Sequence, residues 1–207
     1  MRTLIVRRGF RVRLRGISMK IIGVTGGTGG GKTTITEKMK GYGAEVCDAD
    51  VVARKVVAPG KPALAEIAAE WNVVSGGGLD RKALAKIVFS DANELHKLNG
   101  IVHKYVIDEI KSQMENCRDE IFVIDAIALF ESGLSDICDV TVAVIADFNI
   151  RCDRIMARDV LSREEAIMRI NAQMSDEFYI ERADFVINSS NGVNDEEIGR
   201  IIKGSKV

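Results

Sequence analysis

The stretch Gly26-Gly27-Thr28-Gly29-Gly30-Gly31-Lys32-Thr33 decides how the rest of this chain is interpreted. It follows the apolar run Lys20-Ile21-Ile22-Gly23-Val24, which is typical of a short buried strand. It precedes residues 34–40, which favour a helix ending at Gly41 or Gly43. Between a strand and a helix, the pattern G-x-x-x-x-G-K-[ST] predicts a phosphate-binding loop. Its glycines leave backbone N–H groups unshielded at a helix N-terminus, where the helix dipole favours an anion.

The loop therefore predicts a site for a nucleoside triphosphate and Mg²⁺. Lys32 is expected to reach the β- and γ-phosphates, and the Thr33 hydroxyl is expected to bind the metal. A flexible glycine-rich linker is the alternative, but a linker would not stand between an apolar strand and a helix-forming run. The residues expected to contact the nucleotide are Gly27, Thr28, Gly29, Gly30, Gly31, Lys32, Thr33 and Thr34.

The composition is that of a soluble globular protein. The 207 residues are 46% hydrophobic and 29% charged, enough for one domain with insertions. No apolar run approaches the roughly 20 residues of a membrane-spanning helix, so we expect no membrane partner. The four cysteines are scattered without a C-x-x-C pair, which favours reduced thiols in a cytoplasmic protein over a metal cluster. The sequence does not indicate the oligomeric state.

Charge is distributed unevenly along the chain. Residues 1–18 contain six arginines and no acid, whereas residues 19–207 contain 23 basic and 30 acidic residues, a net charge of −7. The main body therefore argues against a nucleic-acid partner. The basic extension has three interpretations: a targeting or nucleic-acid-binding arm, an edge strand, or a segment absent from the native protein because translation starts at Met19. We favour the third.

The apolar runs predict an α/β fold with a parallel five-stranded sheet flanked by helices. The further strands are expected at residues 44–47, 121–124, 140–145 and 185–188. Pro59-Gly60-Lys61-Pro62 marks a break, after which three helical segments separate the second and third strands. Residues 63–71 form the first, a loop is expected at residues 75–78, Asp80 caps the second at residues 81–89, and Asp91 caps a longer third segment through about residue 116. Residues 59–117 are therefore expected to form an inserted helical lobe that binds the acceptor of the phosphoryl group.

Acidic residues follow two of these strands. In an open parallel sheet ligands bind at the carboxyl ends of the strands, so Asp48 and Asp50 are placed where an acceptor hydroxyl and Mg²⁺ would meet. Both also suit the cap or first turn of the next helix. Arg54 follows Asp50 by four residues, so either an ion pair on the helix surface or a role in substrate binding is open. Asp125 is either a Mg²⁺ ligand or a turn residue.

Two helical segments carry further candidates. Residues 149–158 predict a helix with Arg154 and Arg158 on one face, and Ser162 with Glu165 forms a capping box that opens a second helix through about residue 174. We expect residues 149–176 to form a lid whose arginines neutralise the moving phosphoryl group; a solvated charged helix is the alternative. His103, on the longest helix of the lobe, is either a packing residue or a ligand contact.

Taken together, these residues resemble the dephospho-CoA kinase family. The resemblance spans about residues 19–190, which are expected to lie in a P-loop kinase domain of residues 19–207. Beyond the phosphate-binding loop, the segments that carry it include Cys47-Asp48-Ala49-Asp50 with Ala53-Arg54, Leu129-Phe130-Glu131-Ser132-Gly133-Leu134, Arg154 with Arg158-Asp159, and Ala172-Gln173-Met174-Ser175. Lys104 and Ile127 stand where the family pattern has proline.

The resemblance implies transfer of the ATP γ-phosphate to the ribose 3′-hydroxyl of dephospho-CoA, the last step of coenzyme A synthesis. It makes Asp50 the general base or the carboxylate that orients the acceptor. Lys32, Arg154 and Arg158 would stabilise the transferring group. The competing hypotheses are a P-loop kinase for a nucleoside, nucleotide or shikimate-like acceptor, and a nucleotide-dependent regulatory switch. A GTPase switch would be expected to carry Asn-Lys-x-Asp, and the sequence contains no Asn-Lys pair.

Overall fold

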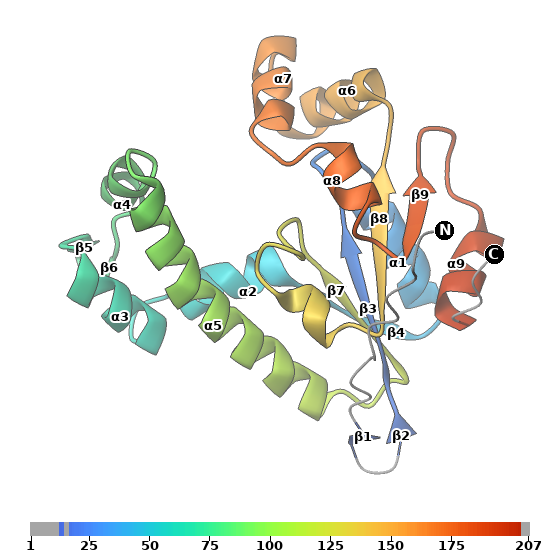
Figure 1. The fold of residues 1–207 in the computed structure, drawn as a ribbon, viewed down its shortest axis with the longest axis horizontal. Helices are drawn as coiled ribbons and strands as arrows, with labels where there is room; N and C mark the ends of the chain where they lie inside the picture. The colour runs from blue at the N-terminus through green and yellow to red at the C-terminus, as the bar shows by residue number, and fades with distance from the viewer. Residues whose placement is uncertain (1–12, 15–16, 204–207) are drawn as a thin grey trace, which may run out of the picture. The chain divides into compact units, whose positions relative to one another are not determined.

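The computed structural model describes residues 13–14 and 17–203, and the chain divides into two compact units (Figure 1). One unit combines the described residues up to Val46 with those from Arg118 onward, and the other is the continuous segment from Cys47 to Cys117. Within the described part of the chain, no helix has both the length and the apolar character that are needed to cross a membrane.

The first unit is built on a five-stranded parallel sheet, which confirms the predicted fold class. The strand order is β4-β7-β3-β8-β9, so the strand that leads into the phosphate-binding loop lies at the centre. In register, Lys20 of β3 lies beside Ile121 of β7, and Ile22 of β3 lies beside Val140 of β8. The strands are β3 (Lys20–Thr25), β4 (Ala44–Asp48), β7 (Ile121–Asp125), β8 (Val140–Ile145) and β9 (Phe185–Asn188).

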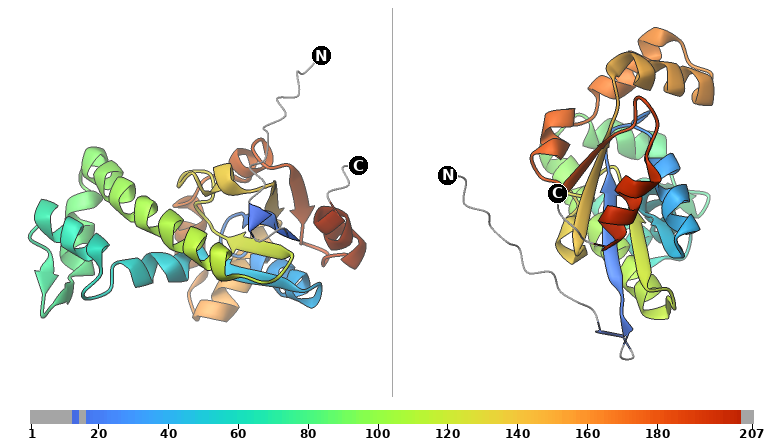
Figure 2. Two further views of the ribbon diagram at one scale, coloured as in Figure 1. Left: turned by 90° about the horizontal axis from the view of Figure 1, so that it is seen from below. Right: turned by 90° about the vertical axis from the view of Figure 1, so that its right-hand side faces the viewer.

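Apolar side chains on one face of this sheet pack against α1 and α9, which contact each other. Figures 1 and 2 show both helices beside the sheet. Alternate residues of β3, Ile22 and Val24, join Ile35 of α1 and Ile198 of α9 in this fully buried core. Helices α1 and α9 therefore cover this face of the sheet, as expected for a parallel sheet flanked by helices. The helices of the unit are α1 (Lys32–Gly41), the 3₁₀ helix η1 (Leu134–Ile137), α6 (Phe148–Asp159), α7 (Arg163–Asn171), α8 (Asp176–Ile180) and α9 (Asp195–Lys203).

Helices α6 and α7 form a hairpin with a small core of its own, built around Cys152, Ile155, Ala166 and Ile170. The predicted capping box is present: the Ser162 hydroxyl accepts from the Glu165 backbone N–H, and the Glu165 carboxylate accepts from the Ser162 N–H. The second helix of the hairpin ends earlier than expected, at Asn171. Ser175 then caps the separate short helix α8, which the sequence analysis did not predict.

The second unit consists mainly of helices packed on α5. Asp80 and Asp91 cap α4 and α5 as predicted, each accepting hydrogen bonds from backbone N–H groups of the first turn. A two-stranded hairpin, β5–β6, replaces the loop expected at residues 75–78. The elements are α2 (Ala49–Val56), α3 (Pro62–Glu70), β5 (Val74–Ser75), β6 (Gly78–Leu79), α4 (Arg81–Val88) and α5 (Ala92–Asn116).

The interpretations of residues 1–18 fall mostly outside the described residues. Of that segment the structure describes only β1 (Arg13–Leu14) and β2 (Ile17–Ser18), which pair with each other in a separate antiparallel sheet. The start of translation at Met19 remains a prediction.

Candidate functional site: a phosphate-binding loop

The phosphate-binding loop joins β3, which ends at Thr25, to α1, which begins at Lys32. Its last residue, Gly31, is the N-cap of α1 and adopts a left-handed backbone conformation with φ 95°. Because glycine has no side chain that caps the helix, the N–H groups of the first turn are left to bind an anion.

Two glycines of the loop are required by its backbone. Gly26 has φ 134°, and a Cβ atom there would lie 2.1 Å from the carbonyl oxygen of Val144 on β8. Gly29 has φ 75°, and a Cβ atom there would lie 2.7 Å from the carbonyl oxygen of Arg151 on α6. The loop thus passes too close to β8 and α6 for any larger residue.

Lys32 lies in the first turn of α1 and folds back onto the loop. Its Nζ donates a hydrogen bond to the carbonyl oxygen of Gly26 at 2.8 Å. The ammonium group is thereby held beside the backbone that would surround a phosphate. Thr33 and Thr34 follow it on the same turn and are exposed. The residues expected to contact the nucleotide, Gly27 to Thr34, therefore lie in the loop and in the first turn of α1 that directly follows it.

Two oxygen donors suit Mg²⁺ at this edge of the sheet. The Thr33 side chain is exposed in the first turn of α1, and Asp125 is the last residue of β7. Asp125 lies in register with Val24 of β3, two residues before the loop. A hydroxyl and a carboxylate are ligand types that Mg²⁺ prefers, so both residues fit the expected ion.

Arg154 and Arg158, both on α6, contact the same loop. Arg154 donates from Nη1 to the carbonyl oxygen of Gly29 at 3.1 Å and from Nη2 to that of Ser189 at 2.9 Å. Arg158 donates to the Thr28 hydroxyl at 3.3 Å and to the carboxylate of Asp159 at 2.8 Å. The hydrogen bond to Asp159 raises the pKa of Arg158, so the Arg158 guanidinium stays protonated. The structure thus brings both arginines to the loop, with Arg154 the more firmly held.

Three further residues hold the loop, and this supporting role was not expected for any of them. Arg151 was counted only among the arginines of residues 149–176 that were expected to neutralise the moving phosphoryl group, and Gln173 and Ser189 had no expected role in the site. The Gln173 side-chain oxygen accepts from the Thr28 N–H at 2.7 Å, and the Ser189 hydroxyl donates to the Gly30 carbonyl at 2.7 Å. Arg151 donates to the Thr28 carbonyl at 3.0 Å. Only weak signals pointed to them: Gln173 lies in a family-like segment, and Ser189 directly follows the last strand at its carboxyl end.

The candidate acceptor residues lie in the second unit. The Asp48 carboxylate accepts from the Val51 N–H at 2.9 Å, so this residue caps α2, which was one of the two roles considered for it. Asp50 and Arg54 lie one turn apart on α2, and both are exposed. Because α2 starts at Ala49, Asp50 belongs to the first helical turn rather than to the strand exit.

His103 lies within α5 and is half-buried. Burial lowers its pKa below the ordinary histidine value, which favours the neutral imidazole. Neutral imidazole can accept or donate a hydrogen bond but adds no charge. Both alternatives for this residue, packing or ligand contact, are compatible with that environment.

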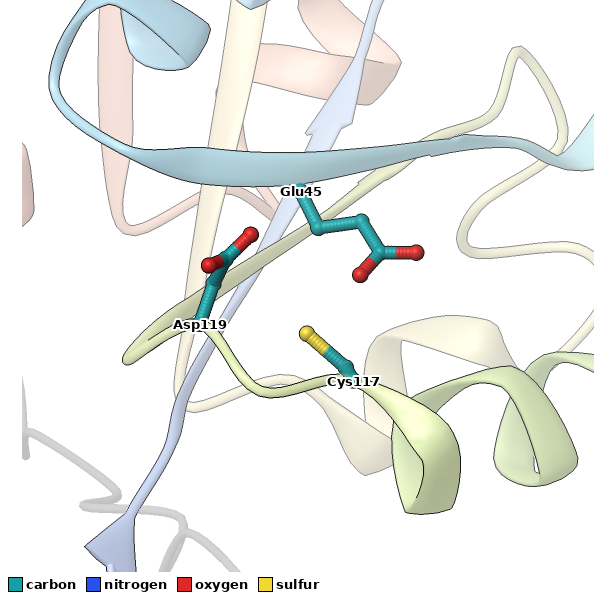
Figure 3. Close-up of side chains that lie close together, drawn as sticks. All are labelled: Glu45, Cys117 and Asp119. Atoms are coloured by element: carbon teal, nitrogen blue, oxygen red, sulfur yellow. The ribbon is translucent and has the colours of Figure 1, made fainter.

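Figure 3 shows another pair of carboxylates in the first unit, Glu45 on β4 and Asp119 in the loop before β7. Their carboxylate oxygens lie within 4.8 Å of each other, and both residues are exposed. Exposed acids often lie this close without binding an ion, so we assign no metal to them. Cys117, also drawn there, is the C-cap of α5.

Comparison with known proteins identifies the family. The family model for dephospho-CoA kinase matches residues 20–195. The dephospho-CoA kinase of Moorella thermoacetica is 42% identical over 82% of this chain and 83% of its own length. That of Fusobacterium nucleatum is 37% identical over 86% of this chain and 94% of its own length. The chain belongs to the dephospho-CoA kinase family. Among solved structures, Thermus thermophilus TT1252 has a TM-score of 0.74 at 33% identity, covering 90% of this chain and 95% of that one.

Membership of the dephospho-CoA kinase family confirms the resemblance seen in the sequence and makes the protein a kinase. The competing acceptors and the regulatory switch are not favoured. The two departures from the family pattern have simple structural settings. Lys104 lies inside α5, which continues without interruption, and it pairs with Glu66 at 3.8 Å. The Ile127 carbonyl accepts from the Thr25 hydroxyl at 3.0 Å.

Proposed function

We propose that the protein is an ATP:dephospho-CoA 3′-phosphotransferase, which transfers the γ-phosphoryl group of ATP to the ribose 3′-hydroxyl of dephospho-CoA and forms coenzyme A and ADP. The observation that carries the proposal is the family match over residues 20–195, which includes the phosphate-binding loop, the whole second unit and the lid segment.

The loop and the lid would bind and stabilise the triphosphate. Backbone N–H groups at the start of α1 would bind the phosphates, and the Lys32 ammonium would move from the Gly26 carbonyl to the β- and γ-phosphates. We assign residues 149–176 to the lid. Within it, Arg158 is 59% exposed and has room to turn toward the transferring group, whereas Arg154 is tied to backbone carbonyls.

Thr33 would hold Mg²⁺, with Asp125 as a second ligand. When bound, the ion neutralises charge on the β- and γ-phosphate oxygens.

Asp50 is the proposed general base. Its carboxylate would orient the ribose 3′-hydroxyl and accept its proton as the oxygen attacks phosphorus. Its exposure on the first turn of α2 leaves it accessible to an acceptor. The proposal requires Asp50 to come within hydrogen-bonding distance of that hydroxyl in the ternary complex. Asp48, Arg54 and His103 are proposed to contact the acceptor.

The helical lobe, residues 59–117 with the adjoining α2, offers a place for the rest of the acceptor. A cavity of about 440 Å³ in the second unit is lined by residues of α2, α3 and α5 and the connecting segment, among them Lys55, Lys61, Tyr105 and Asp108. The lining also includes Val56, Ala58 and Pro62, and such a combination of apolar and polar groups suits an elongated, partly apolar chain that carries amide groups. We therefore propose this cavity for the pantetheine end of dephospho-CoA.

The test is a reaction with Mg-ATP in the presence and absence of dephospho-CoA, with the product identified by mass. We expect one phosphoryl group to be added per dephospho-CoA consumed, together with one ADP. A panel of nucleoside monophosphates, nucleosides and shikimate serves as the control. Phosphorylation of a panel compound without any of dephospho-CoA would overturn the assignment. ATP hydrolysis that is independent of every acceptor would favour a regulatory switch.

We also propose that the protein acts in the cytoplasm, without membrane or nucleic-acid partners. Two of its cysteines, Cys47 and Cys152, are buried, as expected for thiols of a reducing compartment. The net charge of −7 over residues 19–207 supports the absence of a nucleic-acid partner.

A further inference from the structure

Arg151 is a buried cation behind the phosphate-binding loop for which the proposed reaction has no direct use. It lies on α6, and only 6% of its side chain is exposed. Burying a guanidinium is costly, so its N–H groups are expected to be fully used in hydrogen bonds. The contacts of the guanidinium therefore indicate the role of Arg151.

The guanidinium connects the loop to α8. Its Nε donates to the carbonyl oxygen of Thr28 at 3.0 Å, and its Nη1 donates to the carboxylate of Asp176 at 2.9 Å. Because Gln173 accepts from the Thr28 N–H at 2.7 Å, residue 28 of the loop is held at both its N–H and its carbonyl group. The peptide planes on either side of Thr28 are thereby fixed.

The third nitrogen of Arg151, Nη2, has no hydrogen-bond partner among the described residues. A buried donor without a partner costs stability, and a buried ion pair adds little that an apolar pair of similar size would not supply. The Arg151–Asp176 pair is therefore poorly suited to be a stabilising device. It is well suited to set the position of the loop.

Nη2 of Arg151 also bears on the glycine at position 27. A Cβ atom on Gly27 would lie 2.2 Å from Nη2 of Arg151, nearer than any real contact. Gly27 does not have a positive φ, so it is not in the left-handed backbone conformation that favours glycine. The side-chain oxygen of Gln173 would lie farther from this Cβ atom, at 3.3 Å, so the severe clash is with the Arg151 side chain and not with the backbone.

We propose that Arg151 is a positioning residue for nucleotide binding: it fixes Thr28, and through it the direction of the loop N–H groups, and it makes Gly27 obligatory. The inference rests on the proposed binding of ATP at this loop, but it does not depend on which acceptor receives the phosphoryl group.

The test is a double-mutant cycle read out as ADP affinity by calorimetry, for Gly27→Ala and Arg151→Ala alone and together. Each single change is expected to weaken ADP binding by about five- to fiftyfold, which lies within the range of coupling energies measured between contacting residues. In the double variant, Gly27→Ala should add less than about twofold to the effect of Arg151→Ala, because the clash has gone. Arg151→Lys should recover part of the affinity.

Gly30→Ala is the matched control. It also lacks a positive φ, but its Cβ atom would lie 2.8 Å from the carbonyl oxygen of Val144 and 2.9 Å from that of Gly27, which are both backbone atoms. Its effect should therefore be the same with Arg151 or with alanine at position 151. In kinetic assays, Arg151→Ala should raise the KM for ATP and leave the KM for the acceptor within about twofold.

Equal effects of Gly27→Ala in the two backgrounds would overturn the inference. So would an Arg151→Ala protein with lowered thermal stability and unchanged ADP affinity, which would mark the residue as merely structural. If Arg151→Ala does not fold, Arg151→Gln replaces it in the cycle. Because ADP binding is measured directly, failure to phosphorylate dephospho-CoA would count against the proposed function alone.

Discussion

Ser189 offers the sharpest test of how the loop is held, because its replacement by alanine removes two hydrogen bonds and only one heavy atom. The residue directly follows β9 and is 2% exposed. Its hydroxyl donates to the Gly30 carbonyl at 2.7 Å and accepts from Nη1 of Arg154 at 2.8 Å. Loss of one oxygen atom leaves a negligible cavity, so the effect of Ser189→Ala reports the hydrogen bonds.

The magnitude follows from what each partner loses. The hydrogen bond to the charged Arg154 contributes about 1.5–3 kcal/mol, but Nη1 keeps its second acceptor at Gly29, so the lower end applies. Loss of the Gly30 bond contributes about 1 kcal/mol more. We expect Ser189→Ala to lower the free energy of unfolding by about 2–3 kcal/mol, and the Tm by about 5–10 °C for a chain of this size.

Urea and thermal unfolding measure this loss, and Ser190→Ala is the control. Ser190 is the next residue and is half-buried, and its hydroxyl accepts one hydrogen bond from the Asp147 N–H at 2.8 Å. That single neutral bond contributes about 0.5–1.5 kcal/mol. If the two variants were equally stable within about 0.5 kcal/mol, the error expected between independent sites, the loop would not depend on Ser189 and the reasoning would fail.

Four further predictions address the chemistry and the fold. Lys32→Ala should abolish turnover and weaken ATP binding, as measured by calorimetry, whereas an active variant would remove the lysine from the mechanism. Asp50→Asn should keep ATP affinity and lower kcat by about 10²–10⁴-fold in an ADP-release assay; near-normal turnover would exclude it as the base. Burial lowers the pKa of His103, so the unfolded chain binds its proton first. Stability should therefore fall as the pH drops below about 6.5, and His103→Gln should reduce this loss in urea midpoints compared at pH 5.5 and 7.5. Val160 has φ 54° and is 91% exposed, so Val160→Gly should raise the free energy of unfolding by about 0.5–1 kcal/mol; a lower Tm would contradict this.

The elements that the sequence predicted well are those with local signals. Asp80, Asp91 and Ser162 each stand directly before a helix that they cap, so a few neighbouring residues determine where the helix begins. The buried strands have equally local signals, since each apolar run is short and is followed within two residues by glycine, aspartate or asparagine. The phosphate-binding loop also has a local signal, because its glycines, lysine and threonine form one continuous stretch of the sequence.

The features of the fold that were not predicted have physical causes as well. Strands β5 and β6 contain two residues each, too few for any alternation to be seen. Helix α7 was extended to about residue 174 and helix α8 was missed, although Ser175, which accepts from the Phe178 N–H, is a residue type that commonly caps helices. The end of α6 was expected to within one residue, but the left-handed conformation of Val160, which follows the helix, was not expected because valine rarely adopts it.

The supports of the loop could not be predicted from the sequence, and the reason lies in the glycines themselves. A loop of such residues has little conformational preference of its own, so its shape must be imposed from outside. The groups that impose it bind backbone atoms of Thr28 and Gly30 and come from Gln173 and Ser189, which are 145 and 159 residues away in the sequence. Backbone carbonyl and N–H groups can form hydrogen bonds with many types of side chain. The residue type alone therefore does not show which distant positions will support the loop. We therefore expect substitutions on α6 or directly after β9 to alter the affinity of the loop for a nucleotide without contacting it, because the residues there determine the shape of the loop.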